Sequence, residues 1–156
     1  MLSTTAEYAL RIMVTLTESD APSVTSEKIA RRAHVPTDYA VKVLQLLGRA
    51  NLVRAQRGRG GGFRSICDPN VTNLLDVVNA IDPLKRITHC PLDRAEHSEA
   101  LCPLHQPIDD VMAQLENSLR AMTLNAVVSD APGGALCKEK ENNATPLTAS
   151  ARTNGS

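Results

Sequence analysis

The stretch that decides the fold runs from Pro36 to Ile66 and reads Pro36-Thr-Asp-Tyr-Ala-Val-Lys-Val-Leu-Gln-Leu-Leu-Gly-Arg-Ala-Asn-Leu-Val-Arg-Ala-Gln-Arg-Gly-Arg-Gly-Gly-Gly-Phe-Arg-Ser-Ile66. Its first half, from Pro36 to about Ala50, repeats apolar residues at helical spacing, which predicts an amphipathic helix. The expected buried stripe is Ala40, Val43, Leu44 and Leu47. The second half predicts a β-hairpin: a strand over 52–56, a glycine-rich turn over 57–62 and a strand over 63–66.

The residues before this stretch predict the helices that accompany it. Residues 26–33 are expected to form a short helix with Thr25 as its N-cap, and His34-Val35 is the turn that leads into the helix from Pro36. Two short helices joined by a tight turn form a helix-turn-helix. Residues 3–18 predict a further helix with apolar residues on two sides. The fold class is therefore mainly α with a small β-wing, a winged helix-turn-helix.

A winged helix reads DNA with the first turns of its second helix and with its hairpin. The candidate DNA-binding residues of the helix are polar or basic and face outward: Thr37, Tyr39, Lys42 and Arg49. Those of the hairpin are Arg57, Arg59, Gly60 and Gly61, because arginines can reach phosphates or the minor groove while glycines let the backbone approach. The alternatives are a solvated helix face and a flexible turn. No Gly-Lys-Ser/Thr follows the glycines, so this is not a nucleotide phosphate loop.

The composition agrees with a DNA-binding unit joined to a different second part. The chain has 156 residues and 42% hydrophobic residues, but only 2% aromatic residues, which argues against proteins that stack nucleic-acid bases on aromatic rings. Residues 1–65 hold ten Lys/Arg and five Asp/Glu, whereas residues 66–156 hold seven and twelve. A basic front half fits a polyanion partner. No apolar run reaches the ~18 residues of a membrane span, and no signal peptide is evident, so we expect a cytoplasmic protein without a membrane partner.

The second half predicts a ligand-bearing loop and a dimerisation helix. A helix over 74–81, capped by Thr72 or Asn73, completes a DNA-binding domain of residues 1–82. A loop follows over 83–104. The helix from about 104 to 123 carries a heptad-like seam of His105, Ile108, Met112, Leu115, Leu119 and Met122. We expect a second copy of the chain to cover this seam, with the dimerisation region running over 105–128 if 124–128 continues the helix. Residues 129–156 predict a disordered tail.

Two cysteines and two histidines gather within sixteen residues of this loop and the start of the following helix. They are Cys90, His97, Cys102 and His105. Cys102 and His105 lie three residues apart, so they share one helix face. Two thiolates and two imidazoles suit zinc, and thiolates with imidazole also hold iron–sulfur clusters. A loop that binds no metal is the alternative. We find no nucleophile–base pair and no substrate-binding signature, so an enzyme is not expected.

Four segments together resemble the Rrf-two family of bacterial winged-helix regulators, which includes an iron–sulfur-cluster biogenesis regulator and a nitric-oxide-sensing repressor. They are Leu2-Ser-Thr-Thr-Ala-Glu-Tyr-Ala-Leu-Arg, the helix-turn-helix from Ile29 to Leu47, the hairpin from Asn51 to Arg64, and Leu74-Leu-Asp-Val-Val-Asn-Ala-Ile-Asp. The resemblance covers about residues 1–128. It implies a homodimer that binds double-stranded DNA through the helix from Pro36 and the wing at 57–62.

The resemblance also implies a ligand set. Many members of the family hold a cluster on three cysteines before the long helix, and the fourth ligand is either a histidine, which His105 matches, or an acidic residue on the partner's first helix, which Glu7 matches. Glu96 stands where the family's middle cysteine would be, with His97 beside it. We therefore predict a [2Fe–2S] cluster on Cys90, Cys102, His105 and Glu7, with His97 in reserve and zinc as the alternative metal.

These observations lead to one main function hypothesis. The chain is expected to be a homodimeric transcriptional regulator whose DNA affinity is controlled by an iron–sulfur cluster that senses redox state, nitric oxide or iron–sulfur status. A regulator of the same fold that is cluster-free or binds zinc, and that responds to a thiol signal or a partner protein, is the second hypothesis. An iron–sulfur electron carrier is the third, although it would have no use for a helix-turn-helix.

Overall fold

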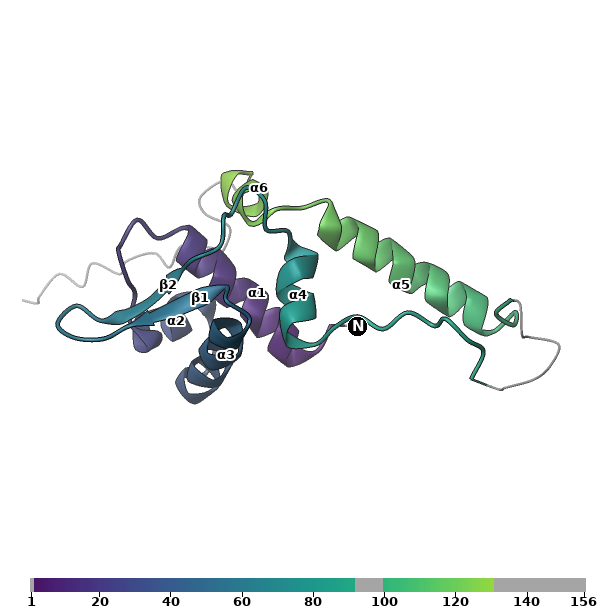
Figure 1. Cartoon of the computed structure of the whole chain (residues 1–156), viewed down its shortest axis with the longest axis horizontal. Helices are drawn as coiled ribbons and strands as arrows, with labels where there is room; N and C mark the ends of the chain where they lie inside the picture. The colour runs from purple at the N-terminus through teal and green to yellow at the C-terminus, as the bar shows by residue number, and fades with distance from the viewer. Residues whose placement is uncertain (1, 92–99, 131–156) are drawn as a thin grey trace, which may run out of the picture.

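The computed structural model describes residues 2–91 and 100–130 as a helical domain with a two-stranded hairpin and one projecting helix (Figure 1). The predicted fold class is confirmed. The elements, in chain order, are α1 (Thr4–Thr17), α2 (Ser26–Ala33), α3 (Thr37–Arg49), β1 (Val53–Gln56), β2 (Gly62–Ser65), α4 (Leu74–Ile81), α5 (His105–Arg120) and α6 (Leu124–Ser129). The expected disordered tail over 129–156 lies, except for its first two residues, outside the described part of the chain. Among the described residues, none of the helices is long and apolar enough to cross a lipid bilayer.

Helix α1 lies at the centre of the domain and packs against α2, α3, α4, α6 and β2. Ser3 caps its first turn through a hydrogen bond from the Ala6 backbone N–H to Oγ. The sequence predicts apolar residues on two sides of this helix. Because both sides must be buried, α1 lies at the centre, where other elements cover it. Ile12 and Met13 have no exposed surface, whereas Leu10 is half-buried.

The helix-turn-helix forms where the sequence predicts it. Thr25 Oγ1 accepts a hydrogen bond from the Lys28 backbone N–H and begins α2. His34 ends α2 in the left-handed conformation, with φ of 52°. This conformation reverses the chain and lets the Val35 backbone N–H donate to Ala30 O, so that α3 begins at a fixed angle to α2. The predicted stripe of α3 is buried: Ala40, Val43, Leu44 and Leu47.

The hairpin is anchored to the segment before α2. β1 and β2 pair antiparallel, with Val53 opposite Ser65 and Gln56 opposite Gly62. Val24 then bridges to Phe63 on the other side of β2, through backbone N–H···O hydrogen bonds of 2.9 and 2.8 Å. The wing is therefore paired to the body of the domain along β2.

The expected continuation of α5 through residue 128 is wrong. α5 ends at Arg120, and Thr123 begins a separate helix, α6, by accepting a hydrogen bond from the Ala126 backbone N–H. A backbone bridge between Asn73 and Thr123 holds this junction beside the start of α4. Leu124 is then fully buried in the core. α6 belongs to the winged-helix body, and α5 projects from it (Figure 1).

The exposed apolar residues along α5 overlap only in part with the predicted seam. Ile108 (46% exposed) and Met122 (46%), which lies just after the helix, belong to the seam, whereas Leu104 (63%), just before the helix, and Val111 (62%) do not. The other members of the predicted seam are half-buried: His105, Met112, Leu115 and Leu119. The reason is that the side of α5 carrying His105 packs inward, with Asp109 one turn further on as the buried residue of the helix.

Candidate metal centre and nucleic-acid interface

Cys90, Cys102 and His105 meet at the start of α5, and their ligand atoms all lie within 4.8 Å of one another. His105 Nδ1 is 3.1 Å from Cys102 Sγ and 3.7 Å from Cys90 Sγ. Cys90 is 8% exposed and Cys102 is 5% exposed. Two buried sulfur atoms beside an imidazole nitrogen form the type of donor set that zinc and iron–sulfur clusters use.

Cys102 is placed to be a thiolate. The backbone N–H groups of His105 and Leu104, at the open N-terminal end of α5, hydrogen-bond to its sulfur, and the His105 ring and the Cys90 thiol do so as well. These contacts, the first of them the strongest, outweigh burial and lower the pKa of Cys102 to about 7. A thiol that ionises near neutral pH is ready to bind a metal ion, because the thiolate is the ligand.

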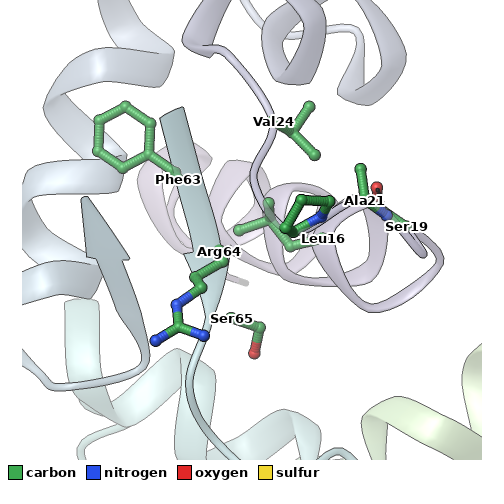
Figure 2. Close-up of a pocket in the computed structure, with 8 residues that line it drawn as sticks. Leu16, Ser19, Ala21, Val24, Phe63, Arg64 and Ser65 are labelled. Atoms are coloured by element: carbon green, nitrogen blue, oxygen red, sulfur yellow. Dashed lines mark hydrogen bonds between the residues drawn. The ribbon is translucent and has the colours of Figure 1, made fainter. Parts of the chain in front are cut away.

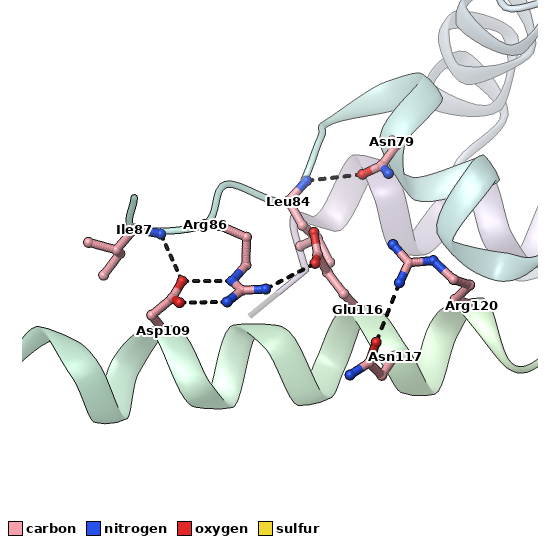
Figure 3. A network of polar contacts seen from close by, with 8 residues as sticks. All are labelled: Asn79, Leu84, Arg86, Ile87, Asp109, Glu116, Asn117 and Arg120. Atoms are coloured by element: carbon pink, nitrogen blue, oxygen red, sulfur yellow. Dashed lines mark hydrogen bonds and ion pairs between the residues drawn. The ribbon is translucent and has the colours of Figure 1, made fainter. Parts of the chain in front are cut away.

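Cys90 comes to the group from a segment that is fastened to α5 by an ion pair (Figure 3). Arg86 donates from Nε and Nη2 to the two carboxylate oxygens of Asp109, at 2.7 and 2.5 Å. The Ile87 backbone N–H donates to Asp109 Oδ1 at 2.9 Å. The Arg86 guanidinium, through these bonds, lowers the pKa of Asp109 to about 2.

Sequence reasoning missed this ion pair. Arg86 and Asp109 are 23 residues apart, so no local pattern connects them. One signal was available: Asp109 and Glu116 lie four and eleven residues after His105, which places both carboxylates on the helix face of the candidate ligand. The Arg86 guanidinium also contacts the Glu116 carboxylate, with 3.4 Å between Arg86 Nη1 and Glu116 Oε2.

The structure does not bring the other two predicted ligands to this group. His97 lies outside the described residues. Glu7 lies on α1 in the winged-helix body, where its carboxylate pairs with Arg11 one turn further on, at 2.7 Å. The N-terminal end of α5 points away from that body (Figure 1). Within one chain, Glu7 and the group at α5 are therefore separate.

Helix α3 presents three of its four predicted DNA-binding residues to solvent. Thr37, Lys42 and Arg49 are exposed. Tyr39 differs from the expectation, because its ring is half-buried and packs edge-on against Tyr8. The hydroxyl oxygen of Tyr39 lies 2.8 Å from Thr5 Oγ1, so this side chain joins α3 to α1.

The wing presents Arg57 and Arg59 at its tip, both exposed. The two predicted glycines are needed by the hairpin itself. Gly60 has a left-handed φ of 80°, and its carbonyl accepts a hydrogen bond from Ser23 Oγ at 2.6 Å. A Cβ atom on Gly61 would lie 2.6 Å from Gln56 O, too close for any other residue. These glycines set the path of the chain between the two arginines and β2.

A hollow of about 220 Å³ lies at the base of the wing, between β2 and the end of α1 (Figure 2). Phe63 and Arg64 are neighbours on β2, and both line this hollow. Phe63 packs on the core and Arg64 is exposed. The exposed basic residues of α2, α3 and the hairpin are Lys28, Arg31, Arg32, Lys42, Arg49, Arg54, Arg57, Arg59 and Arg64. Positive charge gathered on these three elements suits a polyanion.

Comparison with known proteins agrees with this fold. The model of the Rrf2 family, described as iron-dependent transcriptional regulators, matches residues 2–130. A Mycobacterium tuberculosis protein named as an HTH-type transcriptional regulator, Rv1287, is 31% identical over 137 residues, which cover 86% of this chain and 83% of that protein. A Rhodopseudomonas palustris relative, BadM, named in the same way, is 29% identical over 67% of this chain and 68% of its own.

Two solved structures have the same fold at low identity. The structure of T. potens IscR superposes with a TM-score of 0.68 at 20% identity, covering 85% of this chain and 88% of that one. The structure of CymR, the global cysteine regulator of B. subtilis, superposes with a TM-score of 0.66 at 21% identity, covering 85% and 98%. With the winged helix and the family match together, the chain belongs to the Rrf2 (Rrf-two) family of transcriptional regulators.

Proposed function

We propose that this chain is a homodimeric DNA-binding regulator whose affinity for its operator is controlled by an iron–sulfur cluster, most simply [2Fe–2S]. The observation that carries the proposal is the buried group of Cys90, Cys102 and His105 at the start of α5. Thiolate and imidazole donors gathered around one point are a combination that zinc and iron–sulfur sites use, whereas two thiols that only pack in a core have no need of the imidazole.

The donor set fits a cluster with mixed ligands. Cys90 and Cys102 supply the two thiolates, and His105 supplies Nδ1. A [2Fe–2S] cluster takes four ligands, two for each iron. Glu7 of the second subunit is the proposed fourth ligand, and His97 is the reserve. When bound, such a cluster supplies a reversible one-electron change that the side chains alone do not offer, and iron that can react with oxidants or nitric oxide.

The dimer is proposed to form on the exposed apolar stripe of α5. Leu104, Ile108, Val111 and Met122 are each about half exposed or more in the single chain. Grouped apolar residues at helical spacing are typical of an interface with another helix. A second copy of α5 supplies a matching stripe, since a two-fold dimer buries the same surface on both subunits. The same arrangement would let α1 of one subunit approach the metal centre of the other.

The segment that carries Cys90 is connected to the proposed DNA-reading helix, α3, through α4. Cys90 ends a segment that leaves α4, and the Leu84 backbone N–H donates to Asn79 Oδ1 within that helix. α4 packs on both α1 and α3. A change in the position of Cys90 would therefore act on α4 and, through it, on the angle at which α3 meets DNA, which is the kind of two-state element that regulators use.

A zinc-bearing regulator is the second candidate, and the same three donors favour it. Zinc binds Cys and His in tetrahedral sites, and a fourth ligand would complete its coordination. Such a protein would respond to a thiol signal or a partner protein instead of to cluster chemistry.

Anaerobic isolation separates these candidates. The full chain would be purified without oxygen, its visible spectrum recorded, and iron, sulfide and zinc measured per chain. About two irons and two sulfides, with sulfur-to-iron charge-transfer bands, are expected. Selection from random duplex DNA with cluster-loaded and cluster-free protein then gives the operator and tests whether affinity differs between the two. Zinc without sulfide would replace the first candidate by the second. If the purified protein contains neither iron nor zinc, both candidates are excluded.

A further inference from the structure

We propose that Arg86 and Asp109 are positioning residues of the metal centre, which hold Cys90 opposite Cys102 and His105 without binding the metal themselves. This inference rests on the proposed function, since it assigns a role toward the metal that this function requires. The ion pair is called the Arg86–Asp109 clamp below.

The geometry excludes Asp109 as a ligand in this arrangement. Asp109 is 7% exposed. Its two carboxylate oxygens receive three hydrogen bonds, from Arg86 Nε, Arg86 Nη2 and the Ile87 backbone N–H. A carboxylate that is paired in this two-pronged way with a guanidinium has a fixed position and orientation. Asp109 therefore serves as an anchor for the segment that carries Arg86.

The clamp lies between the two sources of ligands. Asp109 is one helical turn after His105 on α5, and Arg86 is four residues before Cys90. When the clamp is closed, four residue steps lead from the anchored Arg86 to Cys90, which limits the distance between their Cα atoms to roughly 13–14 Å at 3.3–3.6 Å per residue. The clamp therefore joins the two ligand-bearing segments at residues that lie four positions from Cys90 and four positions from His105.

A second contact fastens the same segment at its other end. Leu84 N–H bonds to Asn79 Oδ1 of α4 at 3.2 Å, and Arg86 also reaches Glu116 (Figure 3). Without the bonds to Asp109, this segment would keep its bond to α4 and the longer contact of Arg86 with Glu116, but it would lose the two-pronged pairing that fixes Arg86 against α5. Metal binding would then have to order Cys90, and the entropy of ordering lowers the affinity.

The expected effect is a loss of metal affinity of roughly 10- to 100-fold, as is usual when residues that orient metal ligands are removed. The full chain, reduced and metal-free, would be titrated anaerobically with Co²⁺, which gives a thiolate charge-transfer band, in competition with a chelator. Asp109→Asn removes the charge at nearly constant shape, and Arg86→Gln removes the guanidinium. Arg86→Lys, which keeps the charge but loses the two-pronged geometry, should fall between these variants and the parent.

The control is Arg120→Gln, which removes an arginine from the same helix, where its guanidinium contacts Asn117 at 3.4 Å. Its Co²⁺ affinity should match that of the parent. Circular dichroism of each variant reports whether the helices are intact.

A second comparison separates positioning from a merely structural role. The clamp acts through Cys90, so Asp109→Asn should weaken Co²⁺ binding by less than about 2-fold in a Cys90→Ala background. An equal loss in both backgrounds would mean that the clamp only stabilises α5, and would overturn the inference. Unchanged Co²⁺ affinity of both clamp variants in the parent background would also overturn it. If the parent binds neither Co²⁺ nor a cluster, the metal centre itself is wrong, and the clamp proposal fails with it.

Discussion

Glu7 and Arg11 are ion-paired one turn apart on α1, and Arg11 also donates to the carbonyl of His34, in the turn of the helix-turn-helix. The Glu7 carboxylate therefore already has an ion-pair partner within the single chain. If Glu7 of the second subunit becomes a cluster ligand, this ion pair must open, because the carboxylate cannot keep both its guanidinium partner and an iron at full strength.

Glu7→Ala should leave a cluster with an altered visible spectrum and lower stability in air. Water or a neighbouring group can replace an oxygen ligand, so complete loss is not expected. Glu18→Ala removes the same side chain at the end of the same helix and should leave the spectrum unchanged. An unaltered spectrum of Glu7→Ala would remove this residue from the ligand set.

Deletion of either thiol should abolish the cluster. Cys90→Ala and Cys102→Ala each leave one of the two described thiolates, whereas His105→Ala leaves both and should retain a weakened or spectrally changed cluster. Cys67→Ala is the matched control, because Cys67 lies beside β2 and hydrogen-bonds with Ser65. Iron and sulfide per chain are the measurement, and four irons in the parent protein would contradict the [2Fe–2S] assignment.

The Cys102 thiol of the metal-free protein should titrate near pH 7. Its pKa is lowered from 9.0 to about 7 by the backbone N–H of His105 and the further contacts described above. Because the folded pKa is the lower one, the stabilisation from the thiolate is fully present above pH 9 and is lost as the pH falls through about 7. Alkylation of Cys102 by iodoacetamide, followed by mass spectrometry, should reach half its maximal rate near pH 7. A half-maximal rate near pH 9 would disprove the helix N-terminal effect.

Arg57→Ala and Arg59→Ala should weaken binding to all DNA sequences alike. If both arginines contact phosphate, the slope of log affinity against log salt should fall by roughly one for each substitution. Lys42→Ala should instead relax specificity by about 1–3 kcal/mol at one base pair if Lys42 reads a base edge. Arg120→Ala, on α5, is the control for lost charge. An unchanged salt slope in the double wing variant would remove the wing from the DNA interface.

Val111→Lys should convert the proposed dimer to monomers. Val111 is 62% exposed in the single chain, so the substitution costs little within it, but the dimer would bury two unpaired charges at about 3–5 kcal/mol each. Sedimentation velocity gives the oligomeric state. Asn117→Lys adds the same charge on another side of α5 and should remain dimeric. A folded Val111→Lys dimer would place the interface elsewhere.

The winged helix and the identity of the donor residues could be predicted from local patterns in the sequence. Thr25 and Asn73 are N-caps, and the stripe of α3 is buried, because caps and helical spacing are decided by residues within four positions of each other. Cys102 and His105 could be paired for the same reason. The four motif segments also pointed to the family.

How distant segments meet depends on the packing of the whole molecule. The contacts of Arg86 with Asp109 and of Tyr39 with Thr5 join residues 23 and 34 positions apart, and no periodic pattern encodes such pairs. The end of α5 at Arg120 follows from the burial of Leu124 in a core built mainly by the first half of the chain. Which side of α5 stays exposed depends on what the 84–90 segment covers. Burial and ion pairing are properties of the packed molecule, and a local sequence window does not contain them.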